Sequence, residues 1–249
     1  MIAAEIVDGV VLLRMDDGKA NAIQGRFLGA LDAALDEAGD AAPLVLTGAR
    51  RIFSAGLDLP ALAGLSRPAM DELMREFHRV MLRLFLRPAP VVCAVNGHAI
   101  AGGCILAMQG DRRVMADGEG KIGVNEVRLG LSLPAIAVET FRAQLAPPAL
   151  AAAALEGHLF SPAEAAAAGL VDEVAPAGDL VARAVLAARA LAPDGPAFAE
   201  MKRLLRRPAA EALSRSRDED SCAWLDGWFS EPAQRRIGET VAKLKGRSA

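Results

Sequence analysis

Two short segments rich in small residues have the composition needed to present free backbone N–H groups to a substrate oxygen. One spans residues 52–59 (IFSAGLDL) and the other residues 94–104 (AVNGHAIAGGC). Turns built from glycine and alanine after a strand leave N–H groups unpaired. In the second segment Gly102 and Gly103 also begin a predicted helix, whose dipole favours negative charge. Each turn alone is more typical of tight packing, but two that converge would stabilise a developing oxyanion.

A third segment, residues 122–130 (IGVNEVRLG), contains the candidate proton carrier Glu126. A carboxylate held beside a substrate can act as a general base or acid, which typically contributes about 10²–10⁴-fold to a rate. By its sequence surroundings alone, Glu126 is more often a solvated or ion-paired residue. The chain has no phosphate-binding or dinucleotide-binding glycine spacing, and no Ser–His–Asp arrangement is evident.

The composition argues against several other classes of protein. The net charge of −3 does not indicate the excess of positive charge that binding to nucleic acid requires. Three cysteines without a CxxC pair and three histidines without HxxxH spacing predict neither a disulfide framework nor a metal site. The longest apolar runs are too short to span a bilayer, and the N-terminus lacks a basic start followed by an apolar stretch. We therefore expect a cytoplasmic protein that binds neither nucleic acid nor a membrane.

Hydrophobic periodicity predicts the strands and helices that must position these segments. Alternating or continuous apolar runs predict strands, and apolar residues at helical spacing predict helices. The predicted strands cover residues 6–15, 44–47, 91–95 and 113–116, and the predicted helices cover residues 23–35, 66–86 and 104–109. From residue 134 the chain is predicted to be mostly helical, with a hinge at 175–178 and a last helix over 235–245. This order argues for an α/β layered core with helical additions.

Taken together and in this order, the three segments resemble the crotonase, or enoyl-CoA hydratase/isomerase, superfamily. The resemblance extends to residues 19–22 (KANA), 159–165 (LFSPAEA) and 169–174 (GLVDEV), so it covers nearly the whole chain. It implies an α/β fold with a crotonase-type ββα superhelical core over residues 1–175, which would hold the oxyanion hole and the acyl-CoA site. A C-terminal helical region over residues 176–249 would then take part in trimerisation.

The resemblance also assigns roles to individual residues. Family members hold the thioester oxygen with two backbone N–H groups, which here would belong to Leu57 and Gly102, and Glu126 would carry the proton. The residues expected to bind substrate are Ala20, Ala55, Gly56, Leu57, Asp58, Leu59, Gly102 and Asn125. Coenzyme A would be part of the acyl-CoA substrate, so no separate cofactor and no metal are expected. The implied assembly is a homotrimer or a dimer of trimers.

The acid–base groups indicate which reaction the site would run. Family hydratases have two glutamates, and the corresponding positions here are Ile105 and Glu126. An isoleucine cannot deliver a proton to water, whereas one carboxylate can move a proton from C2 to C4 of an acyl chain. Residues 125–130 and 53–59 look like the Δ3,Δ2-enoyl-CoA isomerase branch. Hydration through Glu126 alone, another crotonase reaction and a non-catalytic CoA-binding protein remain as alternatives, and the acyl length stays open because the match weakens after Leu131.

Other conspicuous side chains have a simpler structural interpretation. His98 follows a strand and is expected to be a hydrogen-bonded structural residue, and Cys104 is expected to be inert core. Asp58 is as suited to capping a helix as to touching substrate. Trp224 and Trp228, at helical spacing, are expected to pack rather than to form a nucleotide platform.

Overall fold

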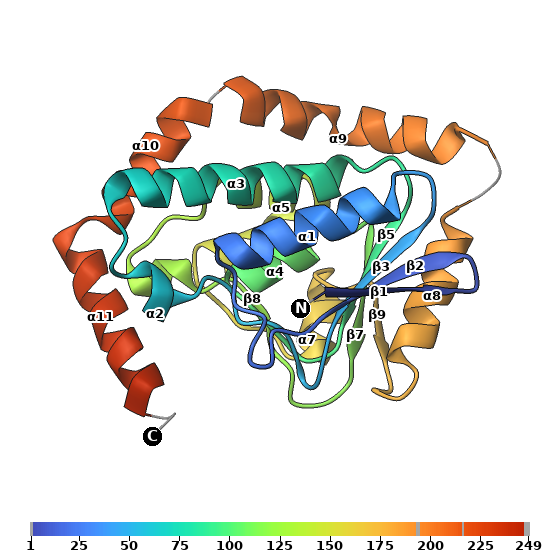
Figure 1. Cartoon of the computed structure of the whole chain (residues 1–249), viewed down its shortest axis with the longest axis horizontal. Coiled ribbons are helices and arrows are strands. Elements are labelled where there is room, and N and C mark those ends of the chain that lie inside the picture. The colour runs from blue at the N-terminus through green and yellow to red at the C-terminus, as the bar shows by residue number, and fades with distance from the viewer. Residues whose placement is uncertain (1, 193–194, 216, 247–249) are drawn as a thin grey trace.

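A computed structural model describes residues 2–192, 195–215 and 217–246, which fold around two β-sheets (Figure 1). In the larger sheet β1 and β2 pair antiparallel and the remaining neighbours pair in parallel, in the order β1-β2-β3-β5-β7-β9. Its strands are β1 (Ile2–Val7), β2 (Val10–Met15), β3 (Leu44–Gly48), β5 (Val91–Val95), β7 (Arg112–Ala116) and β9 (Glu173–Ala175). The smaller, parallel sheet consists of β4 (Ile52–Ser54), β6 (His98–Ile100) and β8 (Ile122–Gly123).

The prediction of one strand over residues 6–15 is wrong, because this stretch contains a hairpin. Asp8 and Gly9 turn the chain between β1 and β2, both at positive φ (49° and 79°). Two consecutive residues at positive φ form the tight turn that matches the twist of paired strands, and Asp-Gly is a favoured sequence for it. The Asp8-Gly9 pair interrupts the apolar residues at the turn, so the local signal for a hairpin was present in the sequence.

The chain passes repeatedly from the larger sheet to the smaller sheet and then into a helix. β3 leads to β4 and then α2 (Leu59–Leu62), β5 leads to β6 and then α4 (Gly102–Ala107), and β7 leads to β8 and then the 3₁₀ helix η1 (Glu126–Leu129). This is the ββα arrangement that the family resemblance implied. Because the three strands of the small sheet are parallel neighbours, the turns that follow them all lie at the same end of that sheet. The three segments with candidate chemistry therefore converge.

Helices cover both faces of the larger sheet. α8 (Leu180–Ala190) packs on one face through Leu180, Ala184, Val185 and Ala188, against Val45, Val92 and Val114. On the other face lie the main core, α1 (Gly25–Ala38) and α3 (Arg67–Leu86) (Figure 1). Burial on both faces accounts for the uninterrupted apolar sequence of β5. α8 follows the predicted hinge at residues 175–178 but packs on the sheet, and the division of the chain after residue 175 stays a prediction.

The long amphipathic helix predicted over residues 66–86 is confirmed. The side chain of Ser66 caps the N-terminus of α3 by accepting a hydrogen bond from the N–H of Ala69, and Pro68 occupies the first turn. The helix ends before Pro88, whose ring cannot continue it. Its buried face consists of Met70, Leu73, Met74, Phe77, Val80, Met81, Leu84 and Phe85.

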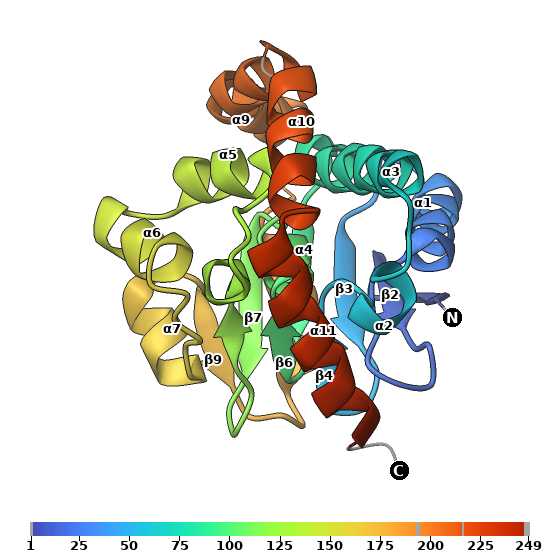
Figure 2. The ribbon, with the colours of Figure 1, turned by 90° about the vertical axis from the view of Figure 1, so that its left-hand side faces the viewer.

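The remaining helices pack on the outside of this core. They are α5 (Ala135–Gln144), α6 (Pro147–Ala154), α7 (Pro162–Ala168), α9 (Ala197–Arg215), α10 (Arg217–Trp228) and α11 (Glu231–Gly246). α9 packs on α5 and α3, α10 packs along α3 and α5, and α11 crosses the molecule in contact with α2 and η1 (Figures 1 and 2). Within the predicted C-terminal region, residues 193–194, 216 and 247–249 lie outside the described part of the chain.

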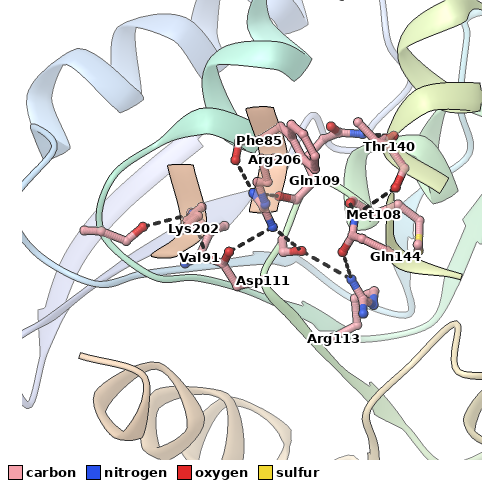
Figure 3. A network of polar contacts seen from close by, with 12 residues as sticks. Phe85, Val91, Met108, Gln109, Asp111, Arg113, Thr140, Gln144, Lys202 and Arg206 are labelled. Carbon is pink, nitrogen blue, oxygen red and sulfur yellow. Dashed lines mark hydrogen bonds and ion pairs between the residues drawn. The ribbon is translucent and has the colours of Figure 1, made fainter. Parts of the chain in front are cut away.

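Buried ion pairs fasten α9 to the core (Figure 3). Asp111, in the turn before β7, pairs with Lys202 at 2.7 Å and Arg206 at 2.8 Å, and it accepts the N–H of Val91 at 2.7 Å. Arg206 also lies over the ring of Phe85, with 4.1 Å from its guanidinium carbon to the ring centroid. Burial lowers the pKa of Lys202 to about 8, against the opposing effect of Asp111. Loss of the single carboxylate would leave two buried cations without their counter-ion.

Candidate active site

A cavity of about 430 Å³ lies where the turns after β4, β6 and β8 meet. Its walls include every residue predicted for the site except Gly56, which lies in the chain between the lining residues Ala55 and Leu57. The predicted residues on the wall are Ala20, Ala55, Leu57, Asp58, Leu59, Gly102, Asn125 and Glu126. Segments more than a hundred residues apart in sequence are thus brought together at one hollow.

The turn after β4 leaves one N–H group unpaired. The N–H of Ile23 donates to the carbonyl of Gly56 at 2.8 Å, and the N–H of Asp58 donates to the carbonyl of Ile23 at 3.0 Å. These two bonds hold the chain on either side of Leu57. Within the described residues, the N–H of Leu57 itself has no hydrogen-bond acceptor. Gly56 permits the turn because its φ is +83°, a region that side chains disfavour.

The turn after β6 leaves a second N–H group unpaired beside the first. Ala101 has φ of 53°, which is uncommon for a residue with a Cβ, and its N–H donates to the carbonyl of Gly123 at 2.8 Å. Gly102 follows as the first residue of α4, where an N–H has no partner in its own helix, and no other described residue accepts from it. A Cβ atom on Gly102 would lie 3.4 Å from the nitrogen of Leu57. The two N–H groups therefore belong to one small region of the cavity wall.

Glu126 lines the cavity, and its carboxyl group is buried enough to shift its pKa from the ordinary value. Its Oε2 atom is buried and has no hydrogen-bond partner among the described residues. Burial raises the pKa of Glu126 from 4.5 to about 7, and the nearby N–H groups of Glu126 and Asn125 oppose that rise. A carboxylate with one unpartnered oxygen and a pKa near neutrality is suited to taking up and returning a proton.

The position of Glu126 is set by the end of its short helix. Gly130 adopts the left-handed conformation with φ of 76°, and its N–H donates to the carbonyl of Val127 at 3.1 Å. The N–H of Leu131 closes the turn by donating to the carbonyl of Glu126 at 3.0 Å. The guanidinium of Arg236, on α11, occupies the space where a side chain at position 130 would point. The end of the Arg236 side chain can shift, so it is the positive φ that favours glycine at this position.

Asp58, the other acidic residue on the cavity wall, already accepts hydrogen bonds from its neighbours. Asp58 caps the N-terminus of α2 by accepting from the N–H of Ala61 at 3.2 Å, and it accepts from Nε2 of Gln24 at 2.8 Å. The structural interpretation of Asp58 thus has direct support. Ile105, on α4, is 2% exposed and also lines the cavity. Among the described lining residues, Glu126 is accordingly the carboxylate without such a structural role.

Part of the wall comes from residues that the sequence did not assign to the site. Met74 and Phe77 come from α3, Trp224 and Trp228 from α10, and Thr240 and Leu244 from α11. The two indole rings stack with 5.4 Å between centroids, which confirms that they pack. Their spacing in sequence identifies a helix face but does not distinguish a core from a cavity wall.

His98 and Cys104 lie off the cavity wall. His98 is exposed, and its Nδ1 accepts the N–H of Lys121 at 3.2 Å, as expected of a structural histidine. Cys104 is fully buried, and burial raises the pKa of its thiol, so the thiolate that would react is disfavoured. Among the described residues, no helix is long and apolar enough to cross a membrane, and no three His, Cys, Asp or Glu side chains are grouped to hold a metal ion.

Solved structures share this architecture. The crystal structure of human mitochondrial delta3-delta2-enoyl-CoA isomerase superposes with a TM-score of 0.91 at 28% identity, covering 100% of this chain and 99% of that chain. An enoyl-CoA hydratase/isomerase family protein from Pseudomonas syringae superposes with a TM-score of 0.84 at 30% identity, covering 90% and 97% of the two chains. The fold is therefore the crotonase fold, with a C-terminal helical region.

Sequence comparison defines the family more narrowly. The family described as enoyl-CoA hydratase/isomerase matches residues 5–233. The mitochondrial enoyl-CoA delta isomerase 1 of Rattus norvegicus is 32% identical over 244 residues, which cover 95% of this chain and 84% of the rat protein. The chain belongs to the enoyl-CoA hydratase/isomerase family.

Proposed function

We propose that this chain is a Δ3,Δ2-enoyl-CoA isomerase, which moves the double bond of an acyl-CoA thioester from C3–C4 to C2–C3. The observation that carries the proposal is that a carboxylate with one unpartnered oxygen, Glu126, shares a cavity wall with two unpaired N–H groups. The substrate would be an acyl-CoA, with coenzyme A as part of it and no separate cofactor.

In the proposed reaction Glu126 carries one proton between two carbons. Its carboxylate takes a proton from C2, and the electron pair of that C–H bond delocalises onto the thioester oxygen. The N–H groups of Leu57 and Gly102 hold the resulting oxyanion, an interaction that typically contributes about 2.7–4 kcal/mol per donor. The protonated Glu126 then returns its proton to C4, the C3–C4 double bond shifts to C2–C3, and the enolate collapses to the thioester. No atom is gained or lost.

The reaction has a rival within the same family. A putative enoyl-CoA hydratase of Thermus thermophilus is 41% identical over 102 residues, covering 38% of this chain and 38% of that protein. Hydration needs a water molecule to be oriented and a proton to be delivered, and Ile105 occupies the cavity wall where a second acid would assist. The apolar Ile105 supports isomerisation over hydration.

A panel of 3-enoyl-, 2-enoyl- and 3-hydroxyacyl-CoAs assayed with purified protein tests the proposal. We expect rapid conversion of the 3-enoyl-CoA to the 2-enoyl-CoA and little hydration of the 2-enoyl-CoA. Rapid hydration would assign the protein to the hydratases. Binding of all three thioesters without turnover would assign it to non-catalytic CoA-binding proteins.

The oligomeric state and the cellular location of the protein stay predictions. A homotrimer or dimer of trimers would bury apolar side chains that α9 exposes, such as Leu205, which is 72% exposed in the isolated chain. Light scattering on the purified protein measures the assembly. Because the similar rat and human proteins are named as mitochondrial, the expected cytoplasmic location requires direct localisation.

A further inference from the structure

The cavity shares part of its wall with a second hollow. This hollow, of about 40 Å³, lies between α3, α10 and the start of α5. Met74, Phe77, Pro134 and Trp224 line both spaces. These four residues are called the partition here, because each of them faces the cavity on one side and the second hollow on the other.

Trp224 is the most firmly held member of the partition. Its Nε1–H donates to the carbonyl of Ser132 at 3.1 Å, and its ring stacks on Trp228, which is 1% exposed. Two anchors on one ring fix both its edge and its face. Met74, on α3, carries no N–H or O–H group that could anchor it, and its unbranched side chain adapts readily to a neighbour.

In the proposed binding mode the acyl tail runs along the cavity wall to the partition. Leu57, Gly102 and Glu126 mark the place of the thioester carbonyl and of carbons C2 to C4 in the proposed reaction. The apolar wall formed by Ile105, Leu131 and the partition continues from there, and a hydrocarbon tail gains free energy by leaving water for such a wall.

We infer that Trp224 sets the maximum length of the straight acyl chain that the site accepts. A chain that ends before the indole fits the cavity as it stands. A longer chain meets a ring that is hydrogen-bonded and stacked, and it must remain partly in water. This inference rests on the proposed acyl-CoA substrate, and it adds a residue that selects among acyl-CoAs by length.

Calorimetric binding of saturated acyl-CoAs, from butanoyl- to hexadecanoyl-CoA, tests the inference without relying on turnover. Each methylene that becomes buried should tighten binding about fourfold, so affinity should rise with chain length and then reach a plateau at the partition. In Trp224→Ala the second hollow joins the cavity, and the plateau should move to longer chains. Below the wild-type plateau the affinities of the two proteins should stay similar.

Three further variants separate length selection from general damage. Trp224→Phe removes the hydrogen bond to Ser132 but keeps most of the ring, so its plateau should stay close to that of the wild type. Met74→Ala opens the partition from α3 and should also extend the plateau, which provides the test if Trp224→Ala does not fold. Ala135 lines only the second hollow of the two, and adding Ala135→Leu to Trp224→Ala should move the plateau back towards the wild-type length.

The outcomes distinguish this inference from the proposed function. An unchanged plateau in folded Trp224→Ala and Met74→Ala proteins would overturn the role of the partition and leave the isomerase proposal intact. Failure of the wild-type protein to bind any acyl-CoA would overturn both. A melting curve for each variant establishes that the protein measured is folded.

Discussion

Gly56 and Gly102 pack backbone against backbone at the edge of the cavity. A Cβ atom on Gly56 would lie 2.9 Å from the nitrogen of Gly102, and a Cβ atom on Gly102 would lie 3.3 Å from the Cα of Gly56. A side chain on Gly56 would push the two turns apart, and a side chain on Gly102 would fit only if its neighbours shifted slightly. The absence of both side chains brings the N–H of Leu57, the residue after Gly56, next to that of Gly102, so one close contact explains glycine at two positions.

Replacement of Gly102 by proline tests the proposed oxyanion contact. Proline removes the N–H outright and is otherwise tolerated in the first turn of a helix. We expect a folded Gly102→Pro protein to lose about 10²–10³-fold in kcat, with a smaller effect on its melting temperature. Steady-state kinetics with a 3-enoyl-CoA, together with thermal unfolding, measures both quantities.

Alanine at the same position is an imperfect control, for a reason visible only in the structure. It keeps the N–H, but its Cβ would lie 3.2 Å from Cδ1 of Ile23 and 3.4 Å from the nitrogen of Leu57, the other donor. We therefore expect Gly102→Ala to be intermediate in activity between the parent and Gly102→Pro. Equal loss in both variants would mean that close packing, rather than the missing donor, explains the effect.

Replacement of Glu126 by glutamine tests the proton carrier. Glutamine keeps the size of the side chain and cannot accept the proton from C2, so isomerisation should fall by about 10²-fold or more. The dissociation constant of a saturated acyl-CoA should change little, because the N–H groups and the apolar wall are retained. A variant that keeps more than about a tenth of the parental turnover would show that another group carries the proton.

The raised pKa of Glu126 predicts how activity and stability depend on pH. The base must be deprotonated, so kcat/KM should increase about tenfold per pH unit below a pKa of about 7 and level off above it. The folded protein holds this proton more tightly than the unfolded chain, whose pKa is 4.5. The free energy of unfolding should therefore decrease as pH rises from 4.5 through 7, by at most about 3 kcal/mol.

Glu126→Gln provides the matched control for the effect of pH on stability. Its free energy of unfolding should lack the decrease between about pH 5 and about pH 8, because no proton is exchanged at this position. Urea unfolding of the two proteins at both pH values measures the difference. Parallel pH dependences in parent and variant would assign the titration to another group.

The part of the site that sequence could predict is the part carried by short local segments. Leu57, Gly102 and Glu126 each follow a strand of the small sheet, and their motifs are contiguous in sequence. Trp224 reaches the cavity only through the path of α9 and α10 around α3, and no local pattern encodes that path. The raised pKa of Glu126 could not be predicted from the sequence either, because it depends on which atoms exclude water from one carboxylate oxygen.

The fold shows the same division between local and long-range information. The helix over Arg67–Leu86 was predictable because its cap, its apolar face and the proline beyond it are all local. The ion pairs of Asp111 with Lys202 and Arg206 join positions about ninety residues apart. Charge complementarity at that separation becomes visible only after the backbone has brought the residues together.

Asp111→Asn should destabilise the protein strongly. The change leaves Lys202 and Arg206 buried without a carboxylate, and breaking a buried pair by removing one partner typically costs about 3–5 kcal/mol. Glu200→Gln is the control on the same helix, since Glu200 pairs with Arg203 in an exposed position and should contribute little. Urea unfolding compares the two variants, and hydrogen exchange should show the amides of α9 losing protection in Asp111→Asn. Equal stability of the two variants would contradict the role of Asp111.

Ile105→Glu tests whether one side chain separates isomerisation from hydration. Ile105 is 2% exposed and shares the cavity wall with Glu126, so the new carboxyl would be buried near the existing one. Two carboxyls in one site raise each other's tendency to hold a proton, so one of them should be protonated near neutral pH and able to donate to the carbon that hydration protonates. We expect weak hydration of a 2-enoyl-CoA, slower isomerisation and a lower melting temperature, because a carboxyl replaces an apolar side chain.

Ile105→Gln adds a polar group of the same size without a titratable proton and should lack the hydration. If Ile105→Glu folds, binds 2-enoyl-CoA and still adds no water, the difference between the two reactions lies in more than this one position.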